Sequence, residues 1–470
     1  MGRDALAGDT IAAIATAAGV GGAARESERD ALAGDTIAAI ATAAGVGGVG
    51  IVRLSGPSAI AIAAAALGVA AGALDRRVRV GWVRDAAGRA IDQVLAFAMR
   101  APASFTGEDV AELHGHGGPH NLARLLTSVV ERGARVAEPG EFTRRAVANG
   151  KLDLIRAEAL LEVIHAGSER AWRLAQANLG GRLGDEVAAL ERRTLALLAE
   201  LEGWIDFPDE DLELASARVI DDELAELAAA CGRLAGGFRH GRAVSQGITV
   251  ALVGPVNVGK SSLLNALVGR ERALVAAAPG TTRDWLEVAD VWHGVAVTLI
   301  DTAGLRATDD PLEQRGIELG ESRVASADVV VVVNDGTAPW NASARYTGRA
   351  VLVRSKVDLD GVRPGGAVIE TSSATGQGLD ALRARVLEVA GVADREGGEQ
   401  AFVTTVRQQA LAATAGAALT AARSARQAAR PPEIVAVELR EAVRSLAQLR
   451  GVEVGERVLD EVFARFCIGK

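Results

Sequence analysis

Residues 254–261, GPVNVGKS, decide the fold of this chain. They match the pattern G-x-x-x-x-G-K-[ST], in which backbone N–H groups and a helix N-terminus surround a phosphate chain. An apolar stretch at 248–253 precedes the motif, and residues 262–267 are suited to open a helix after it. We therefore predict a strand, a phosphate-binding loop and a helix, with Lys260 on the β and γ phosphates and Ser261 on Mg²⁺.

Two segments downstream supply further phosphate-side groups of a P-loop nucleotide site. Residues 301–304, DTAG, follow the apolar stretch 295–300, which places Asp301 to hold Mg²⁺ through water and the Gly304 N–H near the γ phosphate. Residues 280–284, GTTRD, lie in an expected loop and offer Thr282 as a second Mg²⁺ ligand.

Two further segments narrow the nucleotide to GTP. Residues 355–358, SKVD, follow the apolar stretch 350–353 and resemble the guanine-binding motif NKxD, whose Asp accepts the ring N–H and the exocyclic amine. Residues 371–373, TSS, resemble the loop that backs the base. Order and spacing together favour a GTPase over a P-loop ATPase. The predicted GTP-binding residues are Asn257, Val258, Gly259, Lys260, Ser261, Ser262, Thr281, Thr282, Asp301, Thr302, Ala303, Gly304, Ser355, Lys356, Asp358, Ser372 and Ser373.

Two positions depart from common GTPase sequences. Ser355 stands where Asn is usual, and we expect its shorter hydroxyl not to span the gap between the base and the phosphate loop, which lowers nucleotide affinity. Leu305 stands where switch GTPases carry a water-orienting Gln, and an apolar side chain cannot hold water by hydrogen bonding. Another group must position the water.

The composition limits the classes of function. A formal net charge of −9 argues against charge-driven coating of nucleic acid, so any RNA contact is expected to be local or shared with a partner. Only four lysines stand against 47 arginines, and each lysine falls within a motif. Cys231 and Cys467 lie far apart, which gives neither a disulfide framework nor a zinc site. With no long apolar run, we expect a cytoplasmic protein without a membrane segment.

The 470 residues predict about three domains. Residues 3–22 recur at 29–48, and only the second copy continues into a strand-like stretch, so residues 1–28 are predicted to be a disordered extension. Helical patterns flank the nucleotide-binding segment on both sides, which suggests an insertion. The predicted fold is multidomain α/β and α: an N-terminal α/β (α+β) domain at 29–148, a discontinuous helical domain at 149–245 and 393–470, and a doubly wound P-loop GTPase domain at 246–392.

Several motifs outside the nucleotide site resemble the MnmE (TrmE) family of tRNA-modification GTPases. The similarity runs from about residue 33 to residue 470. The motifs that carry it are residues 35–40 (DTIAAI), 50–56 (GIVRLSG), 105–109 (FTGED), 116–118 (HGG), 139–143 (PGEFT), 149–154 (NGKLDL), 205–208 (IDFP) and 466–470 (FCIGK).

The resemblance implies a function with partners and cofactors. The N-terminal domain would dimerise and bind a tetrahydrofolate derivative, 5,10-methylene or 5-formyl, as a one-carbon donor. The chain would form a heterotetramer with an MnmG-like flavoprotein that carries FAD. Together they would add an aminomethyl or carboxymethylaminomethyl group to the wobble uridine of tRNA, while the GTPase domain hydrolyses GTP with Mg²⁺ and K⁺.

The resemblance also assigns residues. It matches Asn257 to a potassium ligand and Glu313 to the catalytic glutamate that positions water. It points Cys467 toward the folate site as a catalytic thiol, although lone cysteines are usually core residues. Candidate folate-binding residues are Arg53, Glu112, Arg145 and Lys151, with ordinary surface charge as the competing interpretation for the cations.

Two alternatives stay open from the sequence. His114, His116 and His120 resemble a metal-binding set, but the intervening glycines and Pro119 favour loop structure. An Era-like or Der-like ribosome-assembly GTPase would carry similar nucleotide motifs. The single GTPase domain, the lack of a following GXXG RNA-binding domain and the terminal CIGK favour the tRNA-modification enzyme.

Overall fold

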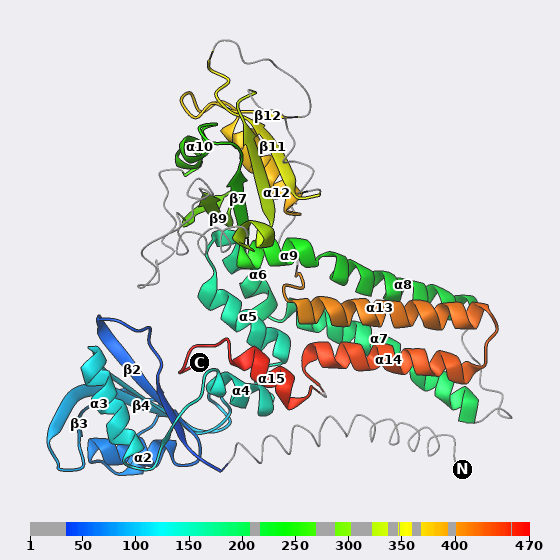
Figure 1. Ribbon diagram of the computed structural model, residues 1–470. Coiled ribbons are helices and arrows are strands. Elements are labelled where there is room, and N and C mark those ends of the chain that lie inside the picture. The colour runs from blue at the N-terminus through cyan, green and yellow to red at the C-terminus, as the bar shows by residue number, and fades with distance from the viewer. Residues whose placement is uncertain are drawn as a thin grey trace. The chain divides into compact units, whose positions relative to one another are not determined.

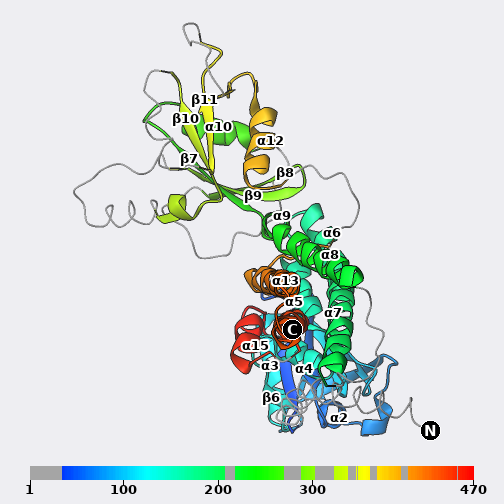
Figure 2. The ribbon, with the colours of Figure 1, turned by 90° about the vertical axis from the view of Figure 1, so that its right-hand side faces the viewer.

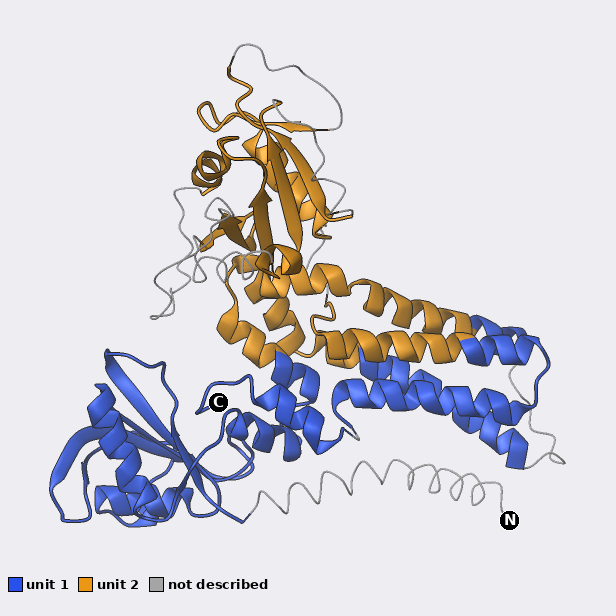
Figure 3. Ribbon diagram, in the orientation of Figure 1, with its two compact units in different colours: residues 1–158, 187–222, 421–470 blue, residues 159–186, 223–420 orange. Residues whose placement is uncertain are grey.

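The computed structural model describes residues 34–206, 217–268, 287–301, 322–336, 346, 348–359, 368–392, 401–452 and 454–470 (Figure 1). The chain forms two compact units, each built from segments that are distant in sequence (Figure 3). The first unit comprises Met1–Glu158, Val187–Asp222 and Ala421–Lys470, and the second comprises Ala159–Glu186 and Glu223–Thr420.

The fold class agrees with the prediction: one α/β sheet lies in each unit, and long helices connect them in sequence. The chain changes unit after residues 158, 186, 222 and 420, all of which fall in the helical segments 149–245 and 393–470. The predicted domain bounds therefore stay a prediction. Among the described residues, no helix combines the length and the hydropathy that crossing a bilayer requires.

Ion pairs and close packing join the long helices inside each unit. In the first unit, Arg450 of α14 donates to Glu191 of α7 at 2.7 Å. In the second unit, Gly416 of α13 lets the helix approach Cys231 of α8, where an added Cβ would lie 3.3 Å from the cysteine Cβ. The helices are α5 (Leu154–His165), α6 (Glu169–Leu179), α7 (Arg182–Asp206), α8 (Ala217–Gly236), α9 (Phe238–Gln246), α13 (Val406–Gln427), α14 (Pro432–Arg450) and α15 (Glu456–Phe463).

The sheet of the second unit has the strand order β12-β11-β10-β7-β9-β8 and is parallel except for the β8–β9 pair. Its central strands are buried on both faces, which explains the unbroken valines of β10. The helices α10 and α12 pack on one face (Figure 2). The elements are β7 (Ile248–Val253), α10 (Lys260–Leu267), β8 (Glu287–Trp292), β9 (Val295–Asp301), β10 (Val329–Asn334), β11 (Ala350–Arg354), β12 (Ile369–Glu370) and α12 (Leu379–Val389).

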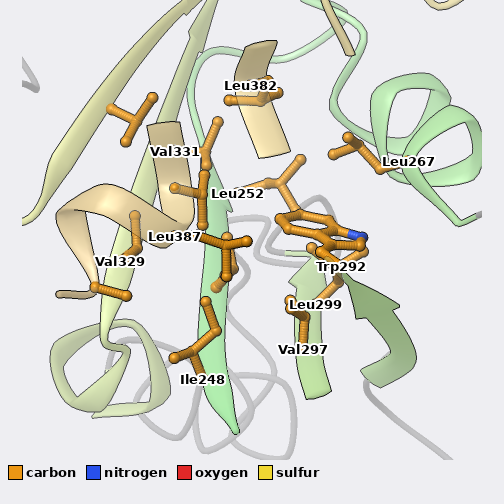
Figure 4. Packing of buried hydrophobic residues seen from close by; sticks show 14 of the residues in the cluster. Ile248, Leu252, Leu267, Trp292, Val297, Leu299, Val329, Val331, Leu382 and Leu387 are labelled. Carbon is orange, nitrogen blue, oxygen red and sulfur yellow. The ribbon is translucent and has the colours of Figure 1, made fainter. Parts of the chain in front are cut away.

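A hydrophobic cluster packs α10 and α12 against the sheet (Figure 4). Leu252 and Val331 of the central strands meet Leu382 and Leu387 of α12. The ring of Trp292 extends the cluster on the β9 side, and its Nε1 donates to Asp290 Oδ2 at 2.9 Å, so this buried indole N–H has an acceptor. The cluster holds the carboxyl ends of β7, β9, β10 and β11 at one edge of the sheet.

The sheet of the first unit has the strand order β3-β4-β5-β2-β1-β6 and is antiparallel except for the β1–β6 pair. Alternating residues of β4 are buried, as expected for a sheet with one face on a core. That core lies beneath α2 and α3. The elements are β1 (Ile37–Ile40), β2 (Gly47–Ser55), α2 (Ala59–Leu67), the 3₁₀ turn η1 (Ala71–Ala73), β3 (Arg79–Arg84), β4 (Ala90–Met99), β5 (Val110–Gly117), α3 (Pro119–Val130), β6 (Arg135–Val136) and α4 (Glu141–Ala148).

The C-terminal tail of the chain lies against this sheet, within the same unit. Ile468 forms an antiparallel bridge with Pro139, immediately before α4. Gly469 has φ 96°, and a Cβ there would lie 2.4 Å from the carbonyl oxygen of Ile40, at the end of β1. Glycine is thus required where the tail crosses the strand end. The tail brings Cys467 to the N-terminal sheet.

A buried cation joins α4 to the sheet. The fully buried Arg145 donates to Asp35 Oδ1 at 2.6 Å, to Glu141 Oε1 at 3.0 Å and to Glu108 Oε1 at 3.2 Å. Arg135 of β6 bonds two of the same carboxylates, Glu141 at 2.7 Å and Asp35 at 2.7 Å. The guanidinium groups of β6 and α4 therefore hold three carboxylates, one in α4 and one in each of the segments that precede β1 and β5.

Two carboxyl groups of this network, those of Glu141 and Asp35, have pKa values below their ordinary range. Burial opposes ionisation of Glu141, but hydrogen bonds from Arg135, the Glu138 N–H and Arg145 outweigh it and hold its pKa below the usual value. Asp35 behaves in the same way: burial raises its pKa, and the stronger effect of Arg135 and Arg145 lowers it. The ionised network thus stabilises the fold at neutral pH.

Replacement of Arg145 by Met should destabilise the first unit by about 3 kcal/mol, because it removes the buried cation between Glu141 and Glu108, whose side chains are only 5% and 15% exposed. The loss is measured as the shift of the corresponding transition in urea unfolding of the full chain. A depressed folded-state pKa stabilises above the unfolded value and loses effect as pH falls through the folded value. The deficit of the variant should therefore shrink below about pH 4.

Arg89→Met is the control for this prediction, because Arg89 is 76% exposed and pairs with Asp85 at the surface. It should shift the transition little. A deficit of Arg145→Met that is no larger than this, or that persists unchanged at low pH, contradicts a stabilising ionic network.

Candidate functional site

The phosphate-binding loop joins β7 to α10, as predicted. Gly254 has φ 151°, and a Cβ there would lie 2.1 Å from the carbonyl oxygen of Val333 in β10. Only glycine therefore lets the loop leave the sheet at this point. Lys260 begins α10, whose first turn supplies N–H groups without intrahelical acceptors and the positive end of the helix dipole.

Two side chains with oxygen atoms meet where β9 ends beside α10. Ser261 Oγ donates to Asp301 Oδ2 at 2.8 Å, and Asp301 is buried. A hydroxyl and a carboxylate are hard donors of the kind that Mg²⁺ takes together with water and phosphate oxygens. The donor set of the described residues thus fits a magnesium ion.

The motif lysine lies across the loop. Lys260 Nζ donates to the carbonyl oxygens of Gly254 at 3.0 Å and Pro255 at 2.8 Å. Burial lowers the pKa of Lys260, and the charge of Asp301 partly offsets this effect. A partly desolvated ammonium beside the loop interacts more strongly with an anion than an exposed one does.

The residue that replaces the usual Asn does reach the phosphate loop. Ser355 Oγ donates to the carbonyl oxygen of Val258 at 2.5 Å, and the residue is buried. The expectation that the hydroxyl is too short to span this gap is therefore wrong on the loop side. The approach of β11 to the loop, which the sequence does not reveal, closes the distance. The contact to the base stays untested.

The neighbouring lysine binds the same loop one residue earlier. Lys356 Nζ donates to the carbonyl oxygen of Asn257 at 2.6 Å and pairs with Asp335 Oδ2 at 3.0 Å. Asp335 is not among the residues predicted from the sequence. The sequence feature that could have identified Asp335 is its position immediately after the apolar strand β10, because the motifs of the other strands also follow their carboxyl ends.

The two predicted base-binding segments lie side by side. The Val357 N–H donates to the carbonyl oxygen of Thr371 at 3.3 Å, which joins the SKVD and TSS segments. Asp358 is exposed, so its carboxylate is available to a ligand. Ser372 is buried, and its Oγ accepts the Thr375 N–H at 3.1 Å, which orders this turn. Ser373 follows it in the same turn.

The other phosphate-loop positions differ in exposure. Val258 is buried, whereas Asn257 and Ser262 are exposed. The backbone carbonyl of Asn257 accepts a hydrogen bond from Lys356, so the side-chain amide oxygen of Asn257 is the atom that could ligate an ion. Potassium prefers carbonyl-type oxygens, so this amide oxygen fits the ion. Thr281, Thr282, Thr302, Ala303, Gly304, Leu305 and Glu313 lie outside the described residues.

A second cluster lies on the N-terminal sheet. Arg53 Nε donates to Glu112 Oε1 at 2.8 Å, and His114 Nε2 lies 2.7 Å from Glu112 Oε2. Arg53 Nη1 also donates to the carbonyl oxygen of Gly469, at 3.4 Å. Burial raises the pKa of Glu112, but the His114 hydrogen bond and Arg53 outweigh it, so the pKa lies below its usual value. Arg53 thus lies on β2 and joins β5, through Glu112, to the carbonyl of Gly469 in the tail.

The other residues predicted near folate make different contacts. Arg145 is fully buried among three carboxylates. Lys151 Nζ donates to the carbonyl oxygen of Pro102 at 3.1 Å. Cys467 is exposed, two residues before the glycine that contacts Arg53. Arg53 and Glu112 are thus joined directly, and the tail brings Cys467 to the same sheet.

The histidines do not share one loop. His114 and His116 lie within β5, which corrects the expectation of loop structure for this glycine-rich stretch. Pairing with β2 accommodates the glycines, since Gly115 and Gly117 face glycines of that strand. His116 Nδ1 bonds Asp92 Oδ1 at 2.7 Å, whereas His114 bonds Glu112, so the two rings serve different carboxylates. Within the described ranges, no cluster of metal-ligating side chains occurs.

The chain is similar to known proteins over nearly its whole length. Two family models match: the MnmE helical domain over residues 154–467, and the N-terminus of the GTP-binding protein TrmE over residues 36–151. The tRNA modification GTPase MnmE of Parasynechococcus marenigrum (strain WH8102) is 45% identical over 475 residues, with 99% of this chain and 100% of the relative covered.

A second relative gives the same result. The tRNA modification GTPase MnmE of Symbiobacterium thermophilum is 41% identical over 487 residues, with 98% of this chain and 99% of the relative covered. Among solved structures, the G domain of the T. maritima FeoB iron transporter covers 30% of this chain and 98% of its own at 29% identity, with a TM-score of 0.25. The full-length similarity establishes that this chain belongs to the MnmE family of tRNA modification GTPases.

Proposed function

We propose that this chain hydrolyses GTP, with Mg²⁺ and K⁺, to drive modification of the wobble uridine of tRNA. In this proposal it is a cytoplasmic homodimer, joined through the N-terminal domain, that forms a heterotetramer with an MnmG-like flavoprotein carrying FAD. A tetrahydrofolate derivative, 5,10-methylene or 5-formyl, donates the one-carbon unit. The product carries an aminomethyl or carboxymethylaminomethyl group. The observation that carries the proposal is the arrangement of Lys260, Ser261 and Asp301 at one sheet edge, in a chain of this family.

Each of these phosphate-side residues has a proposed role. The ammonium of Lys260 balances charge on the β and γ phosphates, since it already lies across the loop that carries them. Ser261 and Asp301 hold magnesium, the second of them through water, and the ion when bound neutralises charge that develops on phosphate oxygens. Thr282 completes this set in the proposal, and the N–H of Gly304 holds the γ phosphate.

Guanine recognition is proposed for Asp358. Its exposed carboxylate accepts the ring N–H and the exocyclic amine, a pair of donors that adenine does not present. The adjoining turn at Ser372 and Ser373 backs the base, because Val357 and Thr371 tie the two segments together. A site built to satisfy both hydrogen bonds discriminates strongly against bases that lack them.

The attacking water is proposed to be positioned by Glu313, through a bridging water. Leu305 offers no hydrogen bond for this purpose, so a carboxylate from another position is needed. Potassium on Asn257 would supply positive charge at the phosphates, in the place where other GTPases use an arginine finger.

Folate is proposed to bind beside the C-terminal tail. Arg53 supplies a cation for the anionic part of the donor, and Glu112 fixes that cation while itself holding His114. Arg145 acts indirectly in this proposal, because it holds α4 and the sheet together from within. Lys151 lies beside the loop at Pro102 and contributes a second cation.

A flavoprotein partner is proposed from the resemblance to the MnmE family, and the chemistry of the reaction supports it. Changing the oxidation level of a one-carbon unit requires a group that carries two electrons, and cofactors supply such chemistry in enzymes. A flavin on the partner would supply it. The role left to this chain is to bind the carbon donor, present the thiol of Cys467 and couple the reaction to GTP hydrolysis.

GTP hydrolysis should be faster in K⁺ than in Na⁺ by about tenfold or more, because potassium on Asn257 is proposed to supply the positive charge that an arginine finger gives in other GTPases. The rate of phosphate release is measured for the full chain in matched chloride buffers with equal Mg²⁺. Asn257→Ala should remove most of the difference. Equal rates in the two salts for the unchanged chain would rule out the potassium mechanism.

Cys467→Ser should abolish wobble modification and leave GTP hydrolysis near its original rate. A serine is close in size but lacks a soft, ionisable nucleophile, and the nucleotide residues belong to other segments. Modification is measured by mass spectrometry of tRNA nucleosides from a strain that lacks the chain and carries the variant.

Cys231→Ala is the matched control for the thiol. Cys231 is buried in α8, and burial raises the pKa of its thiol to about 11, so it is unreactive near neutral pH. The control strain should modify normally. If Cys467→Ser restores modification as well, the thiol has no chemical role, and a collapse of GTP hydrolysis would instead mark Cys467 as structural.

A further inference from the structure

Three residues from three segments form a continuous chain of contacts beside the phosphate loop. Asp335, just after β10, pairs through Oδ2 with Lys356 Nζ at 3.0 Å. The same ammonium donates to the carbonyl oxygen of Asn257 at 2.6 Å. The Asp335 side chain is 14% exposed and the Lys356 side chain 37% exposed, so the pair is partly shielded from water. We call these two residues the Asp335–Lys356 pair.

Backbone strain is concentrated at this contact. Asn257 has φ 63° and Lys356 has φ 60°, in the left-handed region that side chains other than glycine rarely adopt. Among the described residues, four non-glycine residues have positive φ, and the hydrogen bond from Lys356 joins two of them. Such conformations persist where surrounding contacts over-determine them, often at ligand sites.

The contact fixes the direction of the peptide groups. A trans peptide is planar, and its N–H points opposite to its C=O. When Lys356 holds the Asn257 carbonyl, the N–H of Val258 is turned to the other side of the chain. Ser355 holds the next carbonyl, that of Val258, in the same way. The conformation of Asn257, and therefore the place from which its amide oxygen projects, depends on these donors.

The charge of Asp335 has a separate effect. An ammonium beside a cation site repels a second cation, and this repulsion weakens when a carboxylate neutralises the ammonium. The carboxylate of Asp335 lies 3.0 Å from the ammonium of Lys356 and therefore neutralises it. The compact ammonium also bonds a carbonyl and a carboxylate at once, which a planar guanidinium would do in a different geometry. This explains a lysine here in a chain with 47 arginines.

We infer that Asp335 is a positioning residue for the potassium site: it fixes and neutralises Lys356, which in turn sets the conformation of Asn257. The inference rests on the proposed potassium-dependent hydrolysis. It assigns a role to a residue that lies outside the nucleotide motifs and contacts one of them through Lys356. It also links the end of β10 to the ion through one side chain.

Asp335→Asn tests this role in the full chain, with two readouts. The first is the potassium concentration that gives half-maximal GTP hydrolysis, which should rise about fivefold with loss of the neutralising charge. The second is the potassium concentration for half-maximal binding of fluorescent GDP with aluminium fluoride, a transition-state analogue, which should rise in parallel. Affinity for fluorescent GDP alone should change less than about twofold.

Asp380→Asn controls for the change in net charge. Asp380 lies in α12, its side chain is 88% exposed, and its partner is Arg383. It should leave all three values unchanged. Asp335→Glu keeps the charge and should recover most of the potassium response. It also serves as the second variant if Asp335→Asn fails to fold.

The outcomes separate the inference from the function on which it rests. If the unchanged chain shows no preference for K⁺ over Na⁺, the proposed potassium mechanism fails. If that preference holds but Asp335→Asn keeps the original half-activating concentration, the inference is wrong. An equal loss of plain GDP affinity would also overturn it, because that result marks Asp335 as a general support of the loop.

Discussion

The parallel pairing of β7 with β9 on one side and β10 on the other is the constraint on which the nucleotide site depends. It ends three strands at one sheet edge, so the phosphate loop, Asp301 and Asp335 emerge together although many residues separate them in sequence. The buried cluster between the sheet and α10 and α12 fixes this arrangement. The Ser261–Asp301 hydrogen bond and the contacts of Ser355 and Lys356 with the loop are consequences of it.

Charged residues have different roles in the two units. Around the phosphate loop, charged groups are held where a ligand and its ions can meet them, and Lys260 is partly desolvated. In the first unit, Arg145 is fully buried and joins α4 to the residues that precede β1 and β5, whereas Arg53, which contacts Glu112 and the tail, keeps 20% of its side chain exposed. Cations of the same type thus differ in role because of burial and partners, which sets the structural network apart from the proposed folate site.

Much of the nucleotide site was predictable because its signals are local. The strand, loop and helix around residues 254–261 and the strand that ends at Asp301 follow from apolar runs and a motif. The reach of Ser355 was not predictable, since it depends on how closely β11 approaches the loop. Asp335 was missed for the same reason: only the sheet order places it beside Lys356. The burial of Arg145 was not predictable either, because the segments that precede β1 and β5 supply its partners. A loop was expected at His114 and His116 because of the neighbouring glycines, but pairing with β2 makes this stretch a strand.

The central claim is that the carboxyl edge of this sheet holds GTP with Asp358 on the base. Binding of fluorescent GTP and xanthosine triphosphate to the full chain tests it, with Asp358→Asn compared with the unchanged protein. Xanthine carries a carbonyl where guanine carries the exocyclic amine, so an amide at position 358 matches xanthine and a carboxylate matches guanine. The account predicts that the unchanged chain prefers GTP and that the variant prefers xanthosine triphosphate. A variant that keeps the original preference would contradict it.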